Sequence, residues 1–478
     1  MSFSQVLAIV KVALVLGLLS LTTPVSADFF SRAFKAFGGG GKDSAPTGAS
    51  ANFGSEAHVG SIIKFQDGVP YAKLVNNNQV PLVGYGVGNL PHHLVKGMVA
   101  SALQENKKIM LIDTAHASGN EDLVAAGIIK GVEKIGKKTE VHVVTKVWYT
   151  HLGYERTMLS VKESVAALKP AIDNDLVDLK LHVLLHWPRC YEGIPWMDCE
   201  KEEAELPDAV KAAGPDPSKN PKAFKDSWKA LEDLYLSDDY PIASIGLSNF
   251  NLYEIEELSK MARIHPHMIQ VNLWSLLYDA HLVDYCHQRR IHVQVYNTML
   301  STISSPGSAK TPKAFHHVQK VAHDLSAELK ETLSPAQVIL AWLIQHGISV
   351  IPRTSNVARL EENSAVALAA IPALNDQQVE TIAHAIEAFL SGDDFEKDIH
   401  VSVTFHSASK DVMLYWMGEN GDESSEVHVA LIKKGESFEE TTYPGHKFRV
   451  YDPANKDIYK EHEITAKFGE HKNIKVEL

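Results

Sequence analysis

Short apolar runs alternate with amphipathic segments along most of the chain from about residue 60. The apolar runs are typical of buried strands, and the segments between them repeat apolar positions at the spacing of a helix. Repeated strand and helix units predict a parallel sheet. Eight such runs are present, and eight strands can close a barrel that side chains fill. They are 83–86, 109–113, 141–148, 181–188, 242–250, 268–275, 291–297 and 348–354.

The pattern changes after an acidic stretch at 391–398. Residues 400–478 alternate apolar and polar positions in short runs, with Gly, Asn and Asp between the runs. Such period-two alternation with frequent turns predicts strands that bury one face. We therefore expect an α/β barrel domain at 58–392, followed by a small all-β antiparallel sandwich at 400–478.

Residues 1–27 have the features of a secretory signal peptide. An apolar run from Val6 to Leu21 is interrupted only by Lys11, and small residues follow it. The run is short for a stable membrane span, although a signal anchor is the alternative. Residues 28–57 are rich in Gly, Ser and Ala and predict a disordered tether. We expect entry into the secretory pathway, to the ER lumen or the exterior, and no stable membrane span after cleavage.

Charge and cysteine content narrow the range of partners. The formal net charge is -13 and no basic stripe is present, which argues against nucleic-acid binding. Three cysteines are too few for a disulfide scaffold. Cys286 has the setting of a core residue, whereas Cys190 and Cys199 either pair in an oxidising compartment or remain free. Neighbouring histidines do not by themselves give three converging ligands, so we predict no metal site.

Three side chains that can carry protons lie at or near the ends of successive apolar runs. They are Asp113, Lys146 and His186. Because the C-terminal ends of parallel strands meet on one face of the sheet, we expect these side chains to lie together. Asp113 taken alone is explained equally well as the N-cap of the following helix. The long polar loop at 189–226 is either a substrate-side lid or a surface insertion without a role.

Eight motifs between about residues 59 and 390 carry a family resemblance. They are PLVGYGVG, IDTAHASGNE, VTKVW, LHWP, IGLSNF, IQVN, VYN and IPRTSNVARLEEN. In this order and spacing they resemble the aldo-keto reductase family. The resemblance implies a (β/α)8 TIM barrel that binds an extended NADP(H) without a Rossmann fingerprint. It also implies an oxidoreductase that reduces the aldehyde or ketone group of a small carbonyl substrate by hydride transfer.

The resemblance assigns roles to individual residues. Asp113, Lys146 and His186 match three of the family's four catalytic residues. The other matches concern the nicotinamide carboxamide, the face of the nicotinamide ring, and the adenosine phosphate with its adenine. Ser248, Asn249 and Gln270 match the residues at the carboxamide, and Tyr296 matches the residue at the ring face. The residues at the phosphate and adenine are matched by Arg353, Thr354, Arg359, Glu362 and Asn363. Guanidinium groups bind phosphate in planar, bidentate contacts, so this clamp implies NADP(H) in preference to NAD(H).

Ser118 stands where the family has its fourth catalytic residue, a tyrosine that donates a proton to the carbonyl oxygen. A serine hydroxyl is a much poorer acid, and proton donation is typically worth ~10²–10⁴-fold in rate. Either His186 donates instead, or it works through a water in place of the phenol, or the barrel binds cofactor without turnover. His116 substitutes only if its loop turns inward; otherwise it faces solvent. Val87 and Gly88 replace the Thr and Trp of many members, which removes one wall of the predicted substrate pocket.

A second resemblance lies in the C-terminal region. The segment 411–452 resembles the β-domain of the von Hippel-Lindau family, which recognises peptides containing hydroxyproline. Val429 and Phe448 depart from the pattern, because the family has a tyrosine and a tryptophan there. The resemblance implies a protein or peptide partner; the alternative is that these aromatic residues are ordinary core residues. The matching pocket positions are Trp416, Thr442, Tyr443 and His446.

Together these patterns predict an NADP(H)-dependent oxidoreductase whose turnover is slowed by Ser118. The alternative is a non-catalytic NADPH-binding scaffold that acts through its C-terminal interaction domain.

Overall fold

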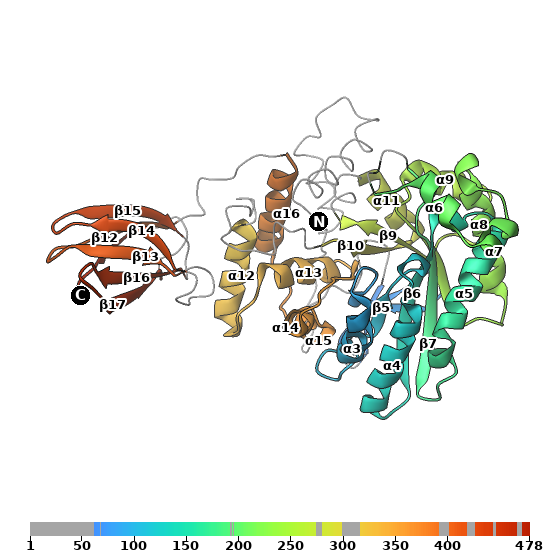
Figure 1. The fold of residues 1–478 in the computed structure, drawn as a ribbon, viewed down its shortest axis with the longest axis horizontal. Coiled ribbons are helices and arrows are strands. Elements are labelled where there is room, and N and C mark those ends of the chain that lie inside the picture. The colour runs from blue at the N-terminus through green and yellow to red at the C-terminus, as the bar shows by residue number, and fades with distance from the viewer. Residues whose placement is uncertain are drawn as a thin grey trace. The chain divides into compact units, whose positions relative to one another are not determined.

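The computed structural model falls into two compact units (Figure 1). The first holds the described residues up to Thr298 together with Ile339–Leu374, and the second holds those of 299–338 and 375–478. The structure describes residues 62–66, 68–191, 194, 196–273, 280–298, 316–391, 401–417, 426–442, 446–465 and 471–478. The expected signal peptide, the tether and the domain boundaries near 58, 392 and 400 lie outside these residues. Among the described helices, none is both long and apolar enough to cross a membrane.

The first unit is the predicted barrel. Eight parallel strands are hydrogen-bonded to one another in sequence order. A parallel bridge between Val83 and Val350 joins the two ends of this sheet, where the Val350 amide donates to the Leu82 carbonyl oxygen at 2.8 Å. The (β/α)8 prediction is therefore confirmed. The strands are β4 (Gly84–Gly86), β5 (Leu111–Asp113), β6 (Thr139–Val147), β7 (Val177–Leu185), β8 (Ile242–Ser248), β9 (Met268–Asn272), β10 (His292–Tyr296) and β11 (Ser349–Val350).

Two glycines let the barrel close at β4. A Cβ atom on Gly84 would lie 2.8 Å from Leu111 Cδ2 and 2.9 Å from Ile351 Cγ2. A Cβ atom on Gly86 would lie 3.1 Å from the Ile351 carbonyl oxygen. Side chains at these positions would push β4 away from its neighbours, so the closure depends on their absence.

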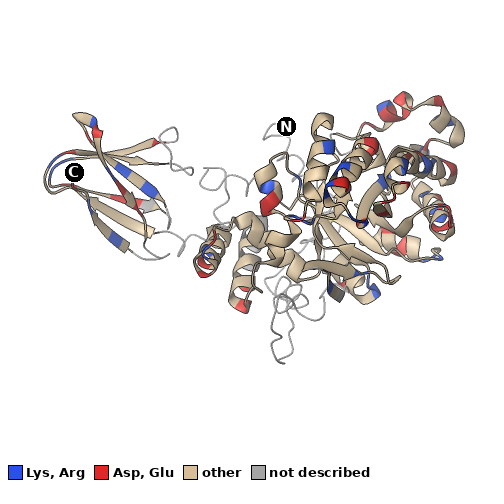
Figure 2. Ribbon diagram, turned by 90° about the horizontal axis from the view of Figure 1, so that it is seen from below, with Lys and Arg blue, Asp and Glu red and all other residues tan. Residues whose placement is uncertain are grey.

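Helices cover the outside of the barrel in Figure 1. In α5 (Tyr154–Ile172), for example, Val161 and Leu168 are buried while Lys169 is exposed, as expected of an amphipathic surface helix. Figure 2 shows Lys and Arg interspersed with Asp and Glu over these helices. The other helices of this unit are α3 (His92–Ala102), α4 (Glu121–Ile135), α6 (Cys199–Glu205), α7 (Asp208–Ala213), α8 (Ala223–Leu236), α9 (Leu252–Ser259), α11 (Ala280–Arg289), α14 (Val357–Glu362) and α15 (Ala365–Ala369).

Short elements complete the first unit. An antiparallel sheet precedes the barrel, and one of its turns carries Asn77 in the left-handed region at φ 69°. Three 3₁₀ turns lie in the loops that the structure describes, and α13 (Pro335–Gln345) includes residues of both units. The sheet strands and turns are β1 (Ile62–Gln66), β2 (Val69–Lys73), β3 (Gln79–Pro81), η2 (His116–Ser118), η3 (Tyr149–His151) and η4 (Pro217–Lys219).

Buried histidines occupy part of the barrel interior. His142 Nδ1 lies 3.0 Å from His182 Nε2, and His182 Nδ1 lies 2.7 Å from Ser244 Oγ. His292 Nε2 lies 2.6 Å from Ser349 Oγ. Burial lowers the pKa of these three imidazoles, to about 3 for His292. They are therefore held neutral in the folded barrel near pH 7.

The described residues of the second unit form two helices and two β-sheets. The sheets pair in the orders β15-β12-β18 and β14-β13-β16-β17, and every pair is antiparallel except β12 with β18. Their shared core includes Phe405 and Phe448, whose ring centroids are 5.1 Å apart. The elements are α12 (His316–Leu329), α16 (Asp376–Ser391), β12 (Val401–His406), β13 (Val412–Trp416), β14 (Val427–Ile432), β15 (Ser437–Thr442), β16 (Lys447–Asp452), β17 (Asn455–Glu463) and β18 (His471–Lys475).

The predicted peptide pocket of this unit is described only in part. Thr442 Oγ1 lies 2.9 Å from His446 Nδ1, and the Trp416 and His446 ring centroids are 5.3 Å apart. Phe448 is 2% exposed, as expected of a core residue, and Val429 packs against the same core. Tyr443 lies outside the described residues. Peptide recognition by this unit therefore stays a prediction.

The buried histidines make the stability of the barrel sensitive to acid. The pKa of His292 is lower in the folded than in the unfolded chain, so its contribution is complete above pH 6.5 and is lost as pH falls towards 3. At pH 5 the histidine is protonated only in the unfolded chain, which lowers the free energy of unfolding by about 2 kcal/mol. We expect His292→Gln to reduce the loss of stability between pH 7 and pH 5 by about that amount, measured by urea unfolding. The exposed His265, replaced by Gln, is the control; an equal effect of both substitutions would contradict the assignment.

Candidate active site

The ion pair between Asp113 and Lys146 lies at the C-terminal ends of β5 and β6. Lys146 Nζ is 2.8 Å from Asp113 Oδ1 and 2.7 Å from Oδ2, and it donates to the Thr114 carbonyl oxygen at 2.7 Å. The two side chains are only 9% and 4% exposed. Asp113 is paired with Val144 in the parallel register, so Lys146 lies two residues further along the neighbouring strand. Asp113 thus holds a lysine, and the alternative role of helix N-cap is wrong, because Asn120 occupies that position.

His186 joins this pair at the end of β7. Its amide donates to the Val147 carbonyl oxygen at 2.9 Å, and its ring centroid is 4.8 Å from that of Trp148. Burial, and then the positive charge of Lys146, hold the pKa of His186 well below its usual range. Its Nδ1 is buried and has no hydrogen-bond partner among the described residues. A neutral imidazole with one unsatisfied nitrogen is thereby available beside the ion pair.

Ser118 ends the turn η2, between β5 and α4. It is partly buried, and its hydroxyl lies close to Gly88, where an added Cβ would be 3.2 Å from Ser118 Oγ. Val87 is fully buried, and its amide donates to the Asp113 carbonyl oxygen at 2.8 Å. The Ser118 hydroxyl thus lies beside Gly88, where the sequence predicted that one wall of the substrate pocket is missing.

The residues expected to contact nicotinamide form one connected group at the ends of β8, β9 and β10. Asn249 Nδ2 donates to Ser248 Oγ at 3.2 Å and to the His186 carbonyl oxygen at 3.0 Å. Tyr296 donates its hydroxyl proton to Asn249 Oδ1 at 2.7 Å, and burial raises the pKa of this phenol. Gln270 Nε2 donates to Asp113 Oδ2 at 2.6 Å. The structure therefore brings all four residues next to the ion pair and His186.

The residues expected to hold the adenosine phosphate follow β11. Arg353 and Arg359 are exposed, and no carboxylate among the described residues pairs with either guanidinium. Tyr85 of β4 donates its hydroxyl proton to the Thr354 carbonyl oxygen at 2.6 Å, and the Arg353 charge acts on that phenol. Two unpaired cations at one end of the barrel suit an anionic ligand. Glu362 is exposed and Asn363 is buried, both at the end of α14.

Aromatic side chains line the site beside His186. Trp196 is 42% exposed, and its ring centroid lies 6.2 Å from that of Trp148 and 5.7 Å from that of Trp187. Trp148 Nε1 donates to Glu202 Oε2 at 2.7 Å. A disulfide joins Cys190 to Cys199, so one of the two alternatives for these cysteines is confirmed. The loop at 189–226 thus brings Trp196 and α6 to the neighbourhood of His186.

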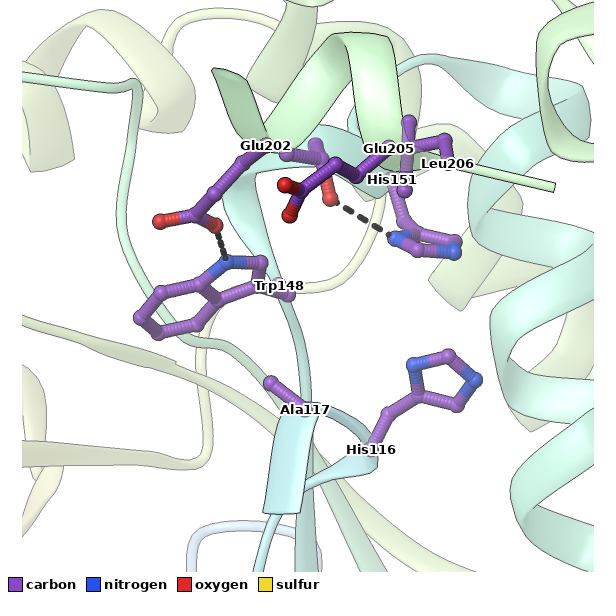
Figure 3. Close-up of a pocket in the computed structure, with 8 residues that line it drawn as sticks. His116, Ala117, Trp148, His151, Glu202, Glu205 and Leu206 are labelled. Carbon is purple, nitrogen blue, oxygen red and sulfur yellow. Dashed lines mark hydrogen bonds between the residues drawn. The ribbon is translucent and has the colours of Figure 1, made fainter. Parts of the chain in front are cut away.

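Trp148 also lines a pocket of about 370 Å³. Figure 3 shows His116 and His151 along one side of it, opposite Trp148 and Glu202. His116 Nε2 is 2.8 Å from Glu163 Oε2 on α5. His116 is therefore partly buried and paired with a carboxylate, which differs from the solvent-facing histidine that the sequence predicted. Burial, and then the charges of His116 and Arg156, lower the pKa of His151 to about 4.

Two residues near the site had no role in the sequence analysis. Asn120 accepts from Thr114 Oγ1 at 2.6 Å and donates to the Val87 carbonyl oxygen at 3.1 Å, which fixes the loop after β5. Gln294 accepts from Gln270 Nε2 at 2.7 Å, and its own Nε2 is buried without a partner among the described residues. Only the inward position of Gln294 in its predicted strand could have indicated a role for this residue. Asn120 lies in the motif IDTAHASGNE, which the family resemblance already includes.

Comparison with known proteins identifies relatives for the first unit. Residues 84–387 match the family described as "Aldo/keto reductase family". The chain is 30% identical over 297 residues to a glyoxal reductase from Bacillus subtilis, covering 61% of this chain and 85% of that protein. It is 28% identical over 304 residues to an NAD(P)H-dependent D-xylose reductase from Candida tropicalis, covering 62% and 87%.

A solved structure shares the fold. It is an aldo-keto reductase from Bombyx mori in complex with NADP, with a TM-score of 0.50 and 22% sequence identity. The match covers 66% of this chain and 92% of that one. At this identity the likeness concerns the fold alone.

The buried ion pair should be sensitive to loss of one partner. Asp113→Asn leaves the Lys146 ammonium buried without a counter-charge, so we expect the free energy of unfolding to fall by about 3–5 kcal/mol. Asp113→Asn combined with Lys146→Met should recover part of this loss, because no unpaired charge remains. Asp173→Asn is the control, since Asp173 pairs with Lys169 on the exposed face of α5, and its effect should stay within about 0.5 kcal/mol. Equal urea midpoints for the Asp113 and Asp173 variants would contradict a buried ion pair.

Proposed function

The chain belongs to the aldo/keto reductase family, and from this membership we propose that its barrel is an NADPH-dependent reductase of aldehydes or ketones. The observation that carries the proposal is the contact of Lys146 Nζ with both oxygens of Asp113, with neutral His186 beside it. The printed names of the relatives support it, since they include a glyoxal reductase and an NAD(P)H-dependent reductase. NADPH, when bound, supplies a hydride to the carbonyl carbon.

The chain's own residues would orient the carbonyl group and manage the proton. His186 is neutral, so a ring nitrogen that bears hydrogen can donate to the carbonyl oxygen. The buried Lys146 charge, balanced by Asp113, favours negative charge developing on that oxygen. We propose that a water in the space of the missing phenol relays a proton from solvent to that oxygen as its negative charge develops, because the serine hydroxyl is too short to reach it. Asp113 acts through Lys146 as a positioning residue.

The cofactor proposal rests on the side chains around the ends of the strands. Ser248, Asn249, Gln270 and Tyr296 form a hydrogen-bonded group beside His186 that fits a carboxamide and an aromatic ring. Arg353 and Arg359, with Thr354, Glu362 and Asn363, fit a phosphorylated adenosine.

A second function is favoured by Ser118. If proton transfer is absent, the barrel binds NADPH without turnover. The protein then acts through the β-sheets at 401–478. Their resemblance to a peptide-binding domain, and the contact between Thr442 and His446, support a protein or peptide partner. The turnover measurements below distinguish the two functions.

We also propose that the chain enters the secretory pathway. The apolar leader supports this, and so does the disulfide between Cys190 and Cys199, because disulfides persist in oxidising compartments. Fractionation that finds the full chain, with its leader intact, in the reducing cytosol would contradict it.

Cofactor selectivity tests the phosphate clamp. Each Arg contact with a phosphate is charge-assisted and worth about 1.5–3 kcal/mol. We therefore expect Arg353→Ala and Arg359→Ala each to weaken NADPH binding by ~10–100-fold while leaving NADH binding unchanged, measured by calorimetry. Lys169→Ala removes an exposed cation from α5 and should change neither affinity. Equal losses for NADPH and NADH would show that the two arginines do not contact the 2′-phosphate.

Turnover tests the role of Ser118. A phenol at this position restores a proton donor, so we expect Ser118→Tyr to raise kcat by ~10²-fold or more with a reactive aldehyde. Ser118→Phe is the matched control, since it adds the ring without the hydroxyl and should give no gain. Lys146→Met should abolish the activity of both the wild type and the Ser118→Tyr variant.

Three results are informative here. Equal rates for the Tyr and Phe variants would contradict the assignment of this position. NADPH binding without turnover in any variant would favour the scaffold. Failure to bind NADPH would contradict both functions.

A further inference from the structure

Two histidines and a glutamate come together outside the proposed catalytic group. His116 lies on η2, His151 on η3 and Glu163 on α5. His116 Nε2 is 2.8 Å from Glu163 Oε2, and the two imidazole centroids are 4.8 Å apart at an interplanar angle of 64°. One ligand atom from each of the three residues lies within 4.8 Å of the other two. Three separate elements thus converge on one point, and two of the three residues, His116 and His151, line the pocket in Figure 3.

The ligand types and spacing suit a transition metal. Zn²⁺ binds imidazole nitrogen and carboxylate oxygen at about 2.0–2.2 Å, so tetrahedral donors lie roughly 3.3 Å apart. The observed 2.8 Å contact and the 4.8 Å limit bracket that value, and side-chain rotations can therefore bring all three donors into range. Imidazole with carboxylate favours zinc, iron, nickel or copper over magnesium and calcium, which prefer oxygen alone.

The surroundings of His151 orient one of its nitrogens. Thr150 Oγ1 lies 3.0 Å from His151 Nδ1, which leaves Nε2 as the nitrogen available for a ligand. Histidine ligands of metals usually have such a partner on the second nitrogen, because it fixes the ring orientation. His151 is 6% exposed, so its ring is also held by packing.

The local charges favour a cation. Glu121 acts electrostatically on His116, and Glu202 and Glu205 line the same pocket. Arg156, whose charge acts on His151 together with that of His116, is bound by both oxygens of Glu203 at 2.9 Å. Carboxylates therefore outnumber unpaired cations around the three ligand atoms.

We propose that His116, His151 and Glu163 bind one divalent transition metal ion, with Zn²⁺ as the best fit, and that the fourth coordination position faces the pocket. The metal would tie η2, which carries Ser118, to η3 and α5. Neighbouring histidines in the sequence gave no sign of this site, because its ligands belong to three different elements. The proposal does not depend on the proposed reduction, since none of the three ligands belongs to the catalytic group.

Zinc titration of the full chain, stripped of metal by a chelator, tests the site. We expect one Zn²⁺ per chain by calorimetry, and Co²⁺ in its place should give the intense visible absorption of a tetrahedral site. Glu163→Gln should weaken Zn²⁺ binding by more than the ~10–100-fold that follows loss of an outer partner, because a direct ligand is removed. Glu163 is 45% exposed, so this variant should fold and keep its affinity for NADPH.

Glu140→Gln is the matched control. Glu140 is 39% exposed and pairs with a histidine, His142, at 3.2 Å, but that pair has no third ligand within the described part of the chain. The control variant should bind Zn²⁺ as the wild type does, and His116→Gln should behave like Glu163→Gln. Absence of Zn²⁺ binding in the wild type would overturn the proposal. Equal Zn²⁺ affinities for the wild type, Glu163→Gln and His116→Gln would also overturn it.

Discussion

The site depends on the burial of two opposite charges between neighbouring strands. Asp113 and Lys146 are almost withdrawn from solvent, and a charge in that environment is tolerated only when its hydrogen-bonding capacity is satisfied. Lys146 meets this requirement with two carboxylate contacts and one carbonyl contact. Gln270, from the far side of the barrel, donates to the same carboxylate. The pair therefore fixes the relative positions of β5, β6 and β9 where ligands are expected to bind.

The barrel divides its polar side chains between two tasks. His142, His182 and His292 are neutral and hydrogen-bonded within the interior. His182 and His292 contact serines on neighbouring strands, and His142 contacts His182. Lys146 and Asp113 remain charged at the C-terminal ends of their strands. In barrels of this kind, the C-terminal face carries the chemistry and the rest supports stability. The barrel tolerates these five buried residues because each of them has a hydrogen-bond or ion-pair partner.

The sequence predicted the strands and the grouping of the site well, for a physical reason. Parallel strands covered on both faces read as continuous apolar runs, and their C-terminal ends must converge in a closed barrel. Asp113, Lys146 and His186 could therefore be grouped before any coordinates. The contacts of His116 with Glu163 and of Trp196 with Trp148 could not be predicted, because they join segments whose approach depends on loop conformation. The parallel pairing of β18 with β12 could not be predicted either, because alternating apolar and polar positions do not indicate strand direction.

In the proposed function, the residues for cofactor binding and the position of the proton donor lie on separate elements. The side chains proposed to hold NADPH come from the ends of β8 to β11 and from α14, whereas the lost proton donor belongs to the turn after β5. A change in that turn therefore leaves the other strand ends undisturbed. Ser118 offers Lys146 no phenol, unlike the tyrosine that the family resemblance implies at this position. The pair persists because removing one partner alone would strand a buried charge, and that cost is present whether or not the barrel turns over substrate.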